Sequence, residues 1–154
     1  MLFRSQLTLA AEIRKPVFLH QRDAHAEFMA VLKRHRQTVN AAVLHCFTGS
    51  ETELQDYLSL DLYIGVTGWI CDERRGSHLR ELVKKIPGNR LLLETDAPYL
   101  FPRDVHPRPA HHRNEPMYLK HISEVVAACV EKPVAQLAAE TTKNAQRFFG
   151  LPPV

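Results

Sequence analysis

The sequence has few cysteines, no long hydrophobic run and little excess charge, and each shortage excludes a class of protein. Its three cysteines, Cys46, Cys71 and Cys129, are widely spaced and form no CxxC pattern. This argues against a disulfide framework and for a reducing compartment, the cytoplasm. No apolar run approaches the roughly 18 residues of a membrane span, and the start, Met1-Leu-Phe-Arg-Ser5, lacks the layout of a secretion signal. We therefore expect a cytoplasmic protein without a membrane partner.

Length and charge set further bounds. The 154 residues are 45% hydrophobic, enough to bury the core of a single domain over 1–154. A complete (β/α)8 barrel needs more, roughly 250 residues. The formal net charge is only +3, from 20 Lys and Arg against 17 Asp and Glu. This excess does not by itself indicate a nucleic-acid partner, but it permits one if the basic residues are concentrated locally.

Short apolar runs alternate with helical patterns in the first hundred residues. They predict strands at 17–20, 41–47, 62–68 and 91–95, and helices at 2–13, 23–35, 50–60 and 73–86. Asp23 and Asp72 are the expected caps of two of these helices, and Ser50 with Glu53 forms a capping-box pattern. The strand ends recur about every 22 to 28 residues, which predicts an α/β fold of parallel βα units.

A long loop and helices follow the last strand. Residues 97–116 contain five prolines and no periodic pattern, which is typical of a functional loop. Its residues Arg103, Arg108, Tyr99 and Phe101 suit phosphate contact and base stacking, although a polar surface loop is the alternative. Three closing helices are predicted: 117–130, a short one that begins at Pro133, and 142–149.

Three potential metal ligands close predicted strands: His20, His45 and Asp96. The carboxyl ends of parallel strands meet at one edge of a sheet, so these side chains are expected to converge on a divalent cation. No Ser or Cys lies in a nucleophile motif, which makes water activated on the metal the simplest nucleophile. Asp96 is a candidate acceptor of the water proton, and Glu94 is expected on the same face. A local hydrogen bond is the alternative for either histidine.

Other residues near the strand ends have two possible roles. Arg74 and Arg75 are candidates for binding a substrate phosphate, or they belong to a solvated helix start. Asp23 is either a helix cap or a partner that orients His20. Cys46, directly after His45, is interpreted as a small buried apolar residue rather than a ligand.

Five motifs resemble, in family order, those of the TatD family of metal-dependent deoxyribonucleases, and they cover nearly the whole chain. They are Pro16–Ala24, Val43–Gly49, Tyr63–Gly68, Leu93–Tyr99 and Arg113–Pro116. The stretch Cys71-Asp-Glu-Arg-Arg-Gly76 is more similar to the founding member of that family than to its paralogues.

The resemblance implies an amidohydrolase-like (β/α)8 barrel of the TIM type with metals at its carboxyl face. It implies hydrolysis of DNA phosphodiester bonds, with 3′ to 5′ exonuclease action on single strands, and single-stranded DNA, or alternatively RNA, as partner. His20 and His45 become metal ligands, Asp96 a ligand and base, and Glu94 a residue of the site. Arg113 belongs to a motif that supports the substrate loop. The implied cofactor is a divalent metal, magnesium first, with manganese or zinc as alternatives.

The chain departs from the family in its extent. The match begins in the helix before the fifth strand, so the chain corresponds to strands 5–8, the carboxyl-terminal half of the barrel. The first-strand metal residues and the fourth-strand glutamate have no counterpart. A half barrel has open sheet edges and an apolar inner face, both prone to association. An internal start in a longer protein is favoured over two copies closing one barrel or a partner that supplies the first half.

The leading hypothesis is a divalent-metal phosphodiesterase that acts on single-stranded DNA. Another amidohydrolase-like reaction, on an ester or amide bond, is the enzymatic alternative, and the arginines favour phosphate over it. The non-enzymatic alternative is an inactive half barrel that needs a partner.

Overall fold

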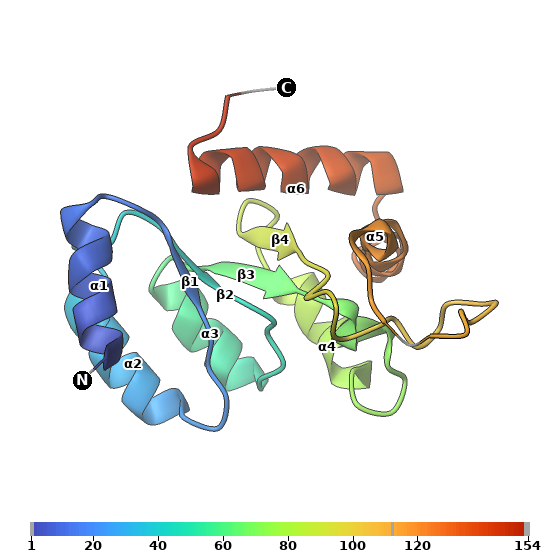
Figure 1. Cartoon of the computed structure of the whole chain (residues 1–154), viewed down its shortest axis with the longest axis horizontal. Coiled ribbons are helices and arrows are strands. Elements are labelled where there is room, and N and C mark those ends of the chain that lie inside the picture. The colour runs from blue at the N-terminus through green and yellow to red at the C-terminus, as the bar shows by residue number, and fades with distance from the viewer. Residues whose placement is uncertain (1, 112, 153–154) are drawn as a thin grey trace.

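The computed structural model describes residues 2–111 and 113–152 and contains one parallel sheet (Figure 1). Its strands are β1 (Val17–Leu19), β2 (Ala42–Leu44), β3 (Tyr63–Val66) and β4 (Leu91–Leu93). They pair in chain order, and every pair is parallel. The parallel βα units predicted from the spacing of the apolar runs are confirmed. Met1, His112, Pro153 and Val154 of the predicted domain 1–154 lie outside the described residues.

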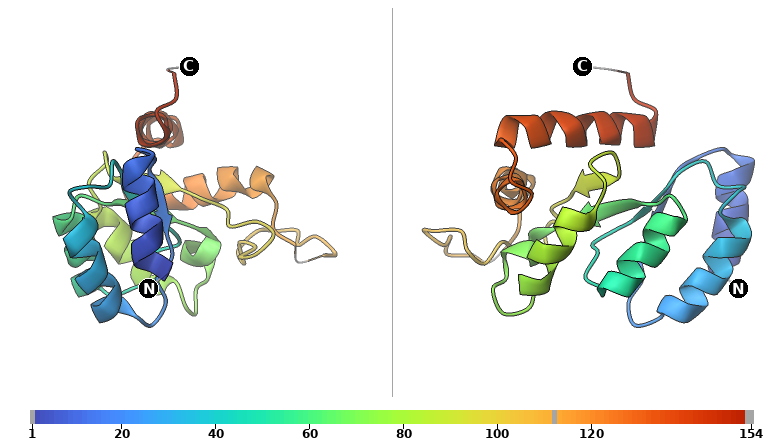
Figure 2. Two further views of the ribbon diagram at one scale, coloured as in Figure 1. Left: turned by 60° about the vertical axis from the view of Figure 1, so that its left-hand side comes forward. Right: turned by 180° about the vertical axis from the view of Figure 1, so that it is seen from behind.

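Helices connect the strands and cover one face of the sheet. The α-helices of the described residues are α1 (Leu2–Glu12), α2 (His25–His35), α3 (Glu51–Ser59), α4 (Ser77–Leu82), α5 (Leu119–Cys129) and α6 (Val134–Phe149). Seen from behind, α2, α3 and α4 lie in front of the strands (Figure 2, right), whereas α6 packs against β4 and α5. No helix in the described part of the chain is long and apolar enough to cross a membrane.

Alternate strand residues belong to two apolar clusters because successive side chains of a strand point to opposite faces. The cluster beneath the helices contains Leu19, Ala42, Leu44, Ile64, Val66 and Leu91. On the other face, Val43, Tyr63 and Leu92 pack under Phe148 of α6. Phe18 lies on that second face too, and it is 53% exposed. The second face is therefore covered only in part.

The strands end earlier than predicted, and hydrogen bonds beyond them hold the next residues in register. The amide of His45 donates to the carbonyl of Leu19 at 2.9 Å. The amide of Glu94 likewise donates to the carbonyl of Val66 at 2.9 Å. The residues that follow β2 and β4 are thereby fixed to the neighbouring strand, although they lie outside the strands themselves.

Two of the predicted helix caps are wrong. α2 begins at His25 with Ala24 at its N-cap, and the exposed Asp23 precedes it with a left-handed φ of 54°. Asp72 accepts hydrogen bonds from the amides of Arg74 and Arg75, at 2.9 and 3.2 Å. These bonds form a turn in place of a first helical turn, because an aspartate side chain competes for nearby amides. α4 consequently begins only at Ser77.

The prediction of three closing helices is also wrong, because α6 is continuous from Val134 to Phe149. The predicted boundary between the helix that begins at Pro133 and the helix 142–149 lies inside α6. Instead, Thr141 Oγ1 donates to the carbonyl of Leu137 inside the helix at 2.9 Å. Asn144 is buried and donates to the carbonyls of Gly88 and Leu91, at 2.7 and 2.9 Å. These polar residues therefore join α6 to β4 and do not end the helix.

Candidate metal centre

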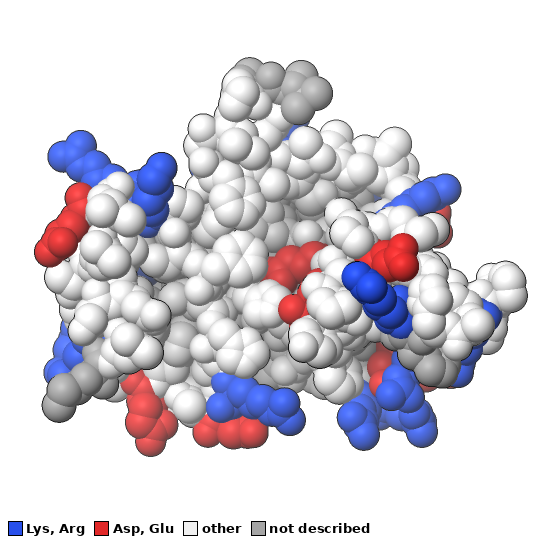
Figure 3. All heavy atoms as spheres, viewed as in Figure 1, with Lys and Arg blue, Asp and Glu red and all other residues white. Residues whose placement is uncertain are grey.

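His45 lies at the centre of a group of ionisable side chains at the carboxyl ends of the strands. Its Nδ1 contacts Oε2 of Glu94, and its Nε2 lies 3.4 Å from Oδ1 of Asp96. The ring of His20 follows β1, and its centroid is 5.9 Å from that of the His45 ring. Acidic side chains gather in a hollow over the ends of β3 and β4 (Figure 3). All four residues selected from the sequence therefore meet at one edge of the sheet.

Glu94 fixes the orientation and protonation of His45. Its hydrogen bond raises the pKa of the imidazole above 6.5 despite burial, and the charge of Asp96 acts in the same direction. The side chain of Glu94 is only 11% exposed. With Nδ1–H donated to this carboxylate, Nε2 is directed towards Asp96. A histidine held in this way by a carboxylate presents its other nitrogen as a metal ligand.

Gly65 of β3 provides the space that Glu94 occupies. A Cβ added at Gly65 would overlap the Glu94 carboxylate, and it would lie 3.3 Å from the carbonyl oxygen of Leu44. Neither the buried carboxylate nor the strand backbone can move away easily. Any side chain at Gly65 therefore displaces Glu94 from His45.

Two residues of the site have a left-handed backbone. Asp96 has a φ of 56°, and Cys46, next to His45, has a φ of 51°. This conformation costs an L-residue roughly 1–2 kcal/mol, and strained residues of this kind tend to cluster at functional sites. The strain turns the chain sharply at the ends of β2 and β4, where the ionisable side chains converge.

The donor atoms fit a divalent cation. Those of His45, Cys46 and Asp96 lie within 4.8 Å of one another, and Oε1 of Glu94 is buried without a hydrogen-bond partner among the described residues. The thiol is the weakest of these donors, because burial raises the pKa of Cys46 to about 11 despite its hydrogen bond with Thr67. Imidazole and carboxylate are thus the suitable ligands, as expected for a borderline or hard cation.

Replacement of Gly65 by alanine is expected to weaken metal binding. Loss of the Glu94 contact frees the His45 ring, and loss of such a partner typically costs about 10- to 100-fold in metal affinity. Titration with Mn²⁺, followed by electron paramagnetic resonance, measures the effect. Gly88→Ala is the matched control, because its Cβ would meet its nearest atoms at an ordinary 3.4 Å. Equal Mn²⁺ affinity of both variants would disprove the role of Gly65.

A cleft of about 800 Å³ opens above the four residues. His20, His45 and Asp96 line it, together with Arg75. The guanidinium carbon of Arg75 lies 5.9 Å from the centroid of the Trp69 ring. Among Arg74, Arg75 and Arg113, Arg75 therefore reaches the cleft. Arg74 and Arg113 are exposed, and they are not among the described residues that line it.

Asn114 anchors the long loop beside the site. It is buried, and its Nδ2 donates to the carbonyls of Thr95 and Tyr99, at 2.7 and 2.6 Å. These bonds tie the end of the loop to the segment that carries Asp96. This agrees with the supporting role expected for the motif Arg113–Pro116, although Asn114, rather than Arg113, makes the contacts.

Sequence reasoning missed His25, His78 and Trp69, which also line the cleft. His25 donates through Nε2 to Asp56 at 2.8 Å, and its Nδ1 lies 2.9 Å from the hydroxyl of Tyr57. His25 opens α2, His78 lies in α4, and Trp69 follows β3. None of them ends an apolar run, so only their position after a strand hinted at the site.

A second group of potential ligands lies elsewhere, at Cys71, Asp104 and His121. The Nε2 of His121 is 2.6 Å from Oδ1 of Asp104, and burial is the main cause that raises the pKa of the Cys71 thiol. The guanidinium of Arg80 lies 4.0 Å from the same carboxylate. A neighbouring cation and a protonated thiol disfavour a metal, so this group primarily joins the long loop to α5.

Comparisons with known proteins identify the relatives of this chain. A family model described as TatD related DNase matches residues 1–150. The 3′-5′ ssDNA/RNA exonuclease TatD of Klebsiella pneumoniae (strain 342) is 57% identical over 149 residues, which are 97% of this chain and 57% of that protein. The protein of the same name from Dickeya dadantii (strain 3937) is 57% identical over 147 residues, 96% of this chain and 56% of that protein. The chain thus spans little more than half the length of these relatives.

Solved structures show the same fold. A TatD homologue of Escherichia coli K12 superposes with a TM-score of 0.83 at 31% identity, over 96% of this chain and 54% of that one. A TatD family hydrolase of Entamoeba histolytica superposes with a TM-score of 0.84, over 96% and 55% of the two chains. Its 22% identity supports the fold alone. The family model and the sequence relatives go further, and they show that this chain belongs to the family of TatD-related DNases.

Proposed function

We propose that this chain forms the metal-binding part of a nuclease that removes nucleotides from single-stranded DNA or RNA in the 3′ to 5′ direction. The observation that carries the proposal is the pair of His45 Nε2 and Asp96 Oδ1, 3.4 Å apart, with the other nitrogen of His45 fixed by Glu94. These substrates and this direction of cleavage are those named for the relatives from Klebsiella pneumoniae and Dickeya dadantii.

His20, His45 and Asp96 are the proposed ligands of a divalent cation. Magnesium is favoured by the family resemblance, whereas the two imidazoles also suit manganese or zinc. The cation, when bound, would lower the pKa of the attacking water and neutralise charge on the phosphate. The exposed position of His20 at the rim of the cleft leaves room for its ring to turn towards that of His45.

The remaining side chains have distinct proposed roles. Asp96 accepts the proton of the attacking water at a carboxylate oxygen, since its side chain is 32% exposed and borders the cleft. Glu94 is a positioning residue that acts through His45, because it is buried beneath that ring. Arg75 holds a substrate phosphate across the cleft. Arg74 and Arg113 contribute more weakly, through the positive charge that they add near the cleft.

We also propose that β1 to β4 are strands 5–8, the carboxyl-terminal half, of a (β/α)8 barrel. The free edge of β1 adjoins an apolar groove of about 820 Å³ that Phe3, Leu7, Phe18 and Phe28 line. Such an edge and groove suit a further βα unit, which would cover the unpaired backbone groups of β1. A segment like the remainder of the longer relatives, or a second copy of the chain, would fill this place.

Release of nucleotides from end-labelled single-stranded DNA tests the proposed activity. We expect release with Mg²⁺ or Mn²⁺, its loss in EDTA, and its recovery when metal is added back, because the ligands act only through the cation. An aryl ester and bis(4-nitrophenyl) phosphate are assayed in parallel. Release that persists in EDTA would refute the metal role, and a preference for the ester would support the amidohydrolase-like alternative.

A further inference from the structure

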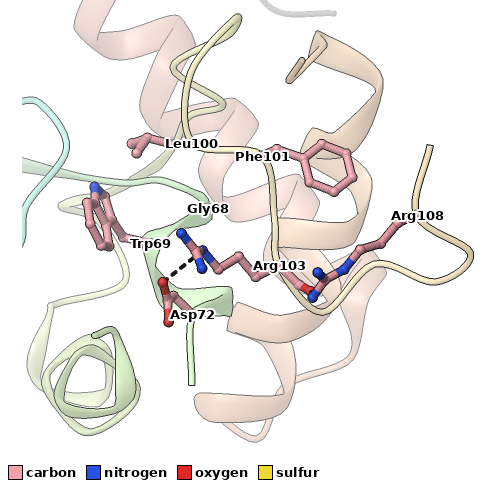
Figure 4. A pocket seen from close by; sticks show the side chains of 7 residues that line it. All are labelled: Gly68, Trp69, Asp72, Leu100, Phe101, Arg103 and Arg108. Carbon is pink, nitrogen blue, oxygen red and sulfur yellow. Dashed lines mark hydrogen bonds and ion pairs between the residues drawn. The ribbon is translucent and has the colours of Figure 1, made fainter. Parts of the chain in front are cut away.

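A second cavity adjoins the cleft. It has a volume of about 570 Å³ and lies between the turn after β3 and the long loop. Figure 4 shows Trp69 and Phe101 on opposite sides of it, with the side chain of Arg103 between them. Trp69 and Leu100 line both this cavity and the cleft. The indole is therefore a wall shared by the cleft and the second cavity. A polymer bound in the cleft can continue past this wall into the second cavity.

Trp69 is held firmly in this wall. It belongs to a 3-10 turn, Gly68–Cys71, whose N-cap Thr67 is buried and accepts the Trp69 amide at 3.5 Å. A Cβ at Gly68 would overlap the carbonyl oxygen of Leu100, so glycine allows the turn and the loop to approach closely. The indole itself is only half-buried. A partly exposed aromatic ring on a well-placed backbone is a stacking platform.

The charges of the cavity favour an anion. Asp72 is buried at its floor, and it is neutralised by two amides and by Arg103 Nε at 3.0 Å. The Nη groups of Arg103 have no partner among the described residues, and its side chain is 52% exposed. Arg108 donates to the carbonyl of Arg103 at 2.7 Å and lines the cavity as well. Two arginines against one aspartate leave a net positive charge.

We propose that this cavity binds the nucleotide next to the scissile phosphodiester of a single strand. This inference rests on the proposed nuclease function. The base stacks on Trp69, and its phosphate contacts Arg103 and Arg108. An aromatic platform with guanidinium groups accepts an unpaired base and its phosphate together. A paired base in a duplex has no free face to stack on Trp69 unless it is extruded. The cavity thus selects a single strand.

Trp69 is the only tryptophan of the sequence, so its fluorescence reports on a base that stacks at the wall between the cleft and this cavity. The Asp96→Ala chain, which is expected not to cleave, is titrated with oligothymidylate and with an abasic sugar–phosphate oligomer of equal length. Anisotropy of labelled oligomers measures binding separately. We expect both oligomers to bind but only oligothymidylate to quench the indole emission. Trp69→Leu is expected to weaken oligothymidylate binding about 10-fold, the size of one lost stacking contact.

The arginines are tested by Arg108→Gln and Arg103→Gln, with Arg34→Gln on the exposed surface of α2 as control. Both cavity variants are expected to bind the abasic oligomer several-fold more weakly than the control. Arg108→Gln leaves the Arg103–Asp72 ion pair intact, although it removes the hydrogen bond to the Arg103 carbonyl, so thermal unfolding of both variants is measured beside binding. Equal binding by all three variants would overturn the phosphate contacts.

The outcomes separate this inference from the proposed function. Binding without quenching, equal quenching by both oligomers, or no binding would overturn the cavity assignment. If the wild-type chain nevertheless releases nucleotides, the proposed nuclease function is retained and only the cavity assignment is rejected. Quenching by oligothymidylate without any nucleotide release would support the cavity and refute the activity.

Discussion

Asp96→Ala is expected to lower the release of nucleotides by roughly 1,000-fold or more, since it removes a proposed metal ligand and the proton acceptor together. The fold should persist, because the side chain is 32% exposed. Rates of release from end-labelled single-stranded DNA, measured with saturating Mg²⁺ or Mn²⁺, give the size of the effect.

The backbone conformation of Asp96 calls for a second variant beside Asp96→Ala. Asp96 has a φ of 56°, which asparagine tolerates better than alanine. Asp96→Asn therefore keeps the local turn while it removes the charge, and it should lose activity to a similar degree. Glu81→Gln, on the exposed surface of α4, is the control for loss of a carboxylate. Full activity of Asp96→Asn would eliminate the carboxylate from the mechanism.

Phe18→Glu is expected to abolish association of the chain along its free edge. Phe18 lines the apolar groove beside β1 and is 53% exposed. A further βα unit packed there would bury the glutamate without a partner, at a cost of at least about 3 kcal/mol, or roughly 100-fold in Kd. Thermal unfolding of the chain alone should change less than association does, because the Phe18 side chain is already 53% exposed and only part of its ring packs against Phe148 and Phe149.

Light scattering and co-purification test this association. The chain is mixed with itself, or with the amino-terminal half of the Klebsiella pneumoniae relative, and nucleotide release is measured on each mixture. Met117→Glu is a matched control, since Met117 is 69% exposed and belongs to the turn Pro116–Tyr118 rather than to the β1 groove. If Phe18→Glu associates as well as this control does, the groove beside β1 is not the interface.

Local sequence was sufficient to predict the strands and the side of the sheet on which the site lies. His45 and Asp96 each close an apolar run, so the runs that predicted β2 and β4 also placed both residues at the carboxyl ends of parallel strands, which meet at one edge of the sheet. The capping box was equally local: Ser50 accepts the Glu53 amide at 3.3 Å, and Glu53 accepts the Ser50 amide at 2.6 Å. Such contacts need only three or four residues, so their pattern is visible in the sequence.

The local sequence pattern led to wrong predictions of helix ends where a polar residue had more than one possible hydrogen-bond partner. Asp72 was expected to cap a helix and instead closes a turn that also binds Arg103. Thr141 was expected near a helix break and lies inside α6, because Asn144 finds carbonyl partners at the end of a distant turn. Asp72 binds both the nearby amides of Arg74 and Arg75 and the distant Arg103, whereas the partners of Asn144 lie on another element.

The sequence by itself determined the family, the parallel order of the strands and the residue types at their ends, because hydrophobic period and motif spacing are properties of the chain alone. Tertiary structure alone decided how those residues act on one another. Glu94 binds a histidine 49 positions away, Gly65 gives it room from a third strand, and Trp69 joins two cavities only when the long loop folds over it. Contacts of this kind depend on close packing between elements, which no local pattern of residues specifies.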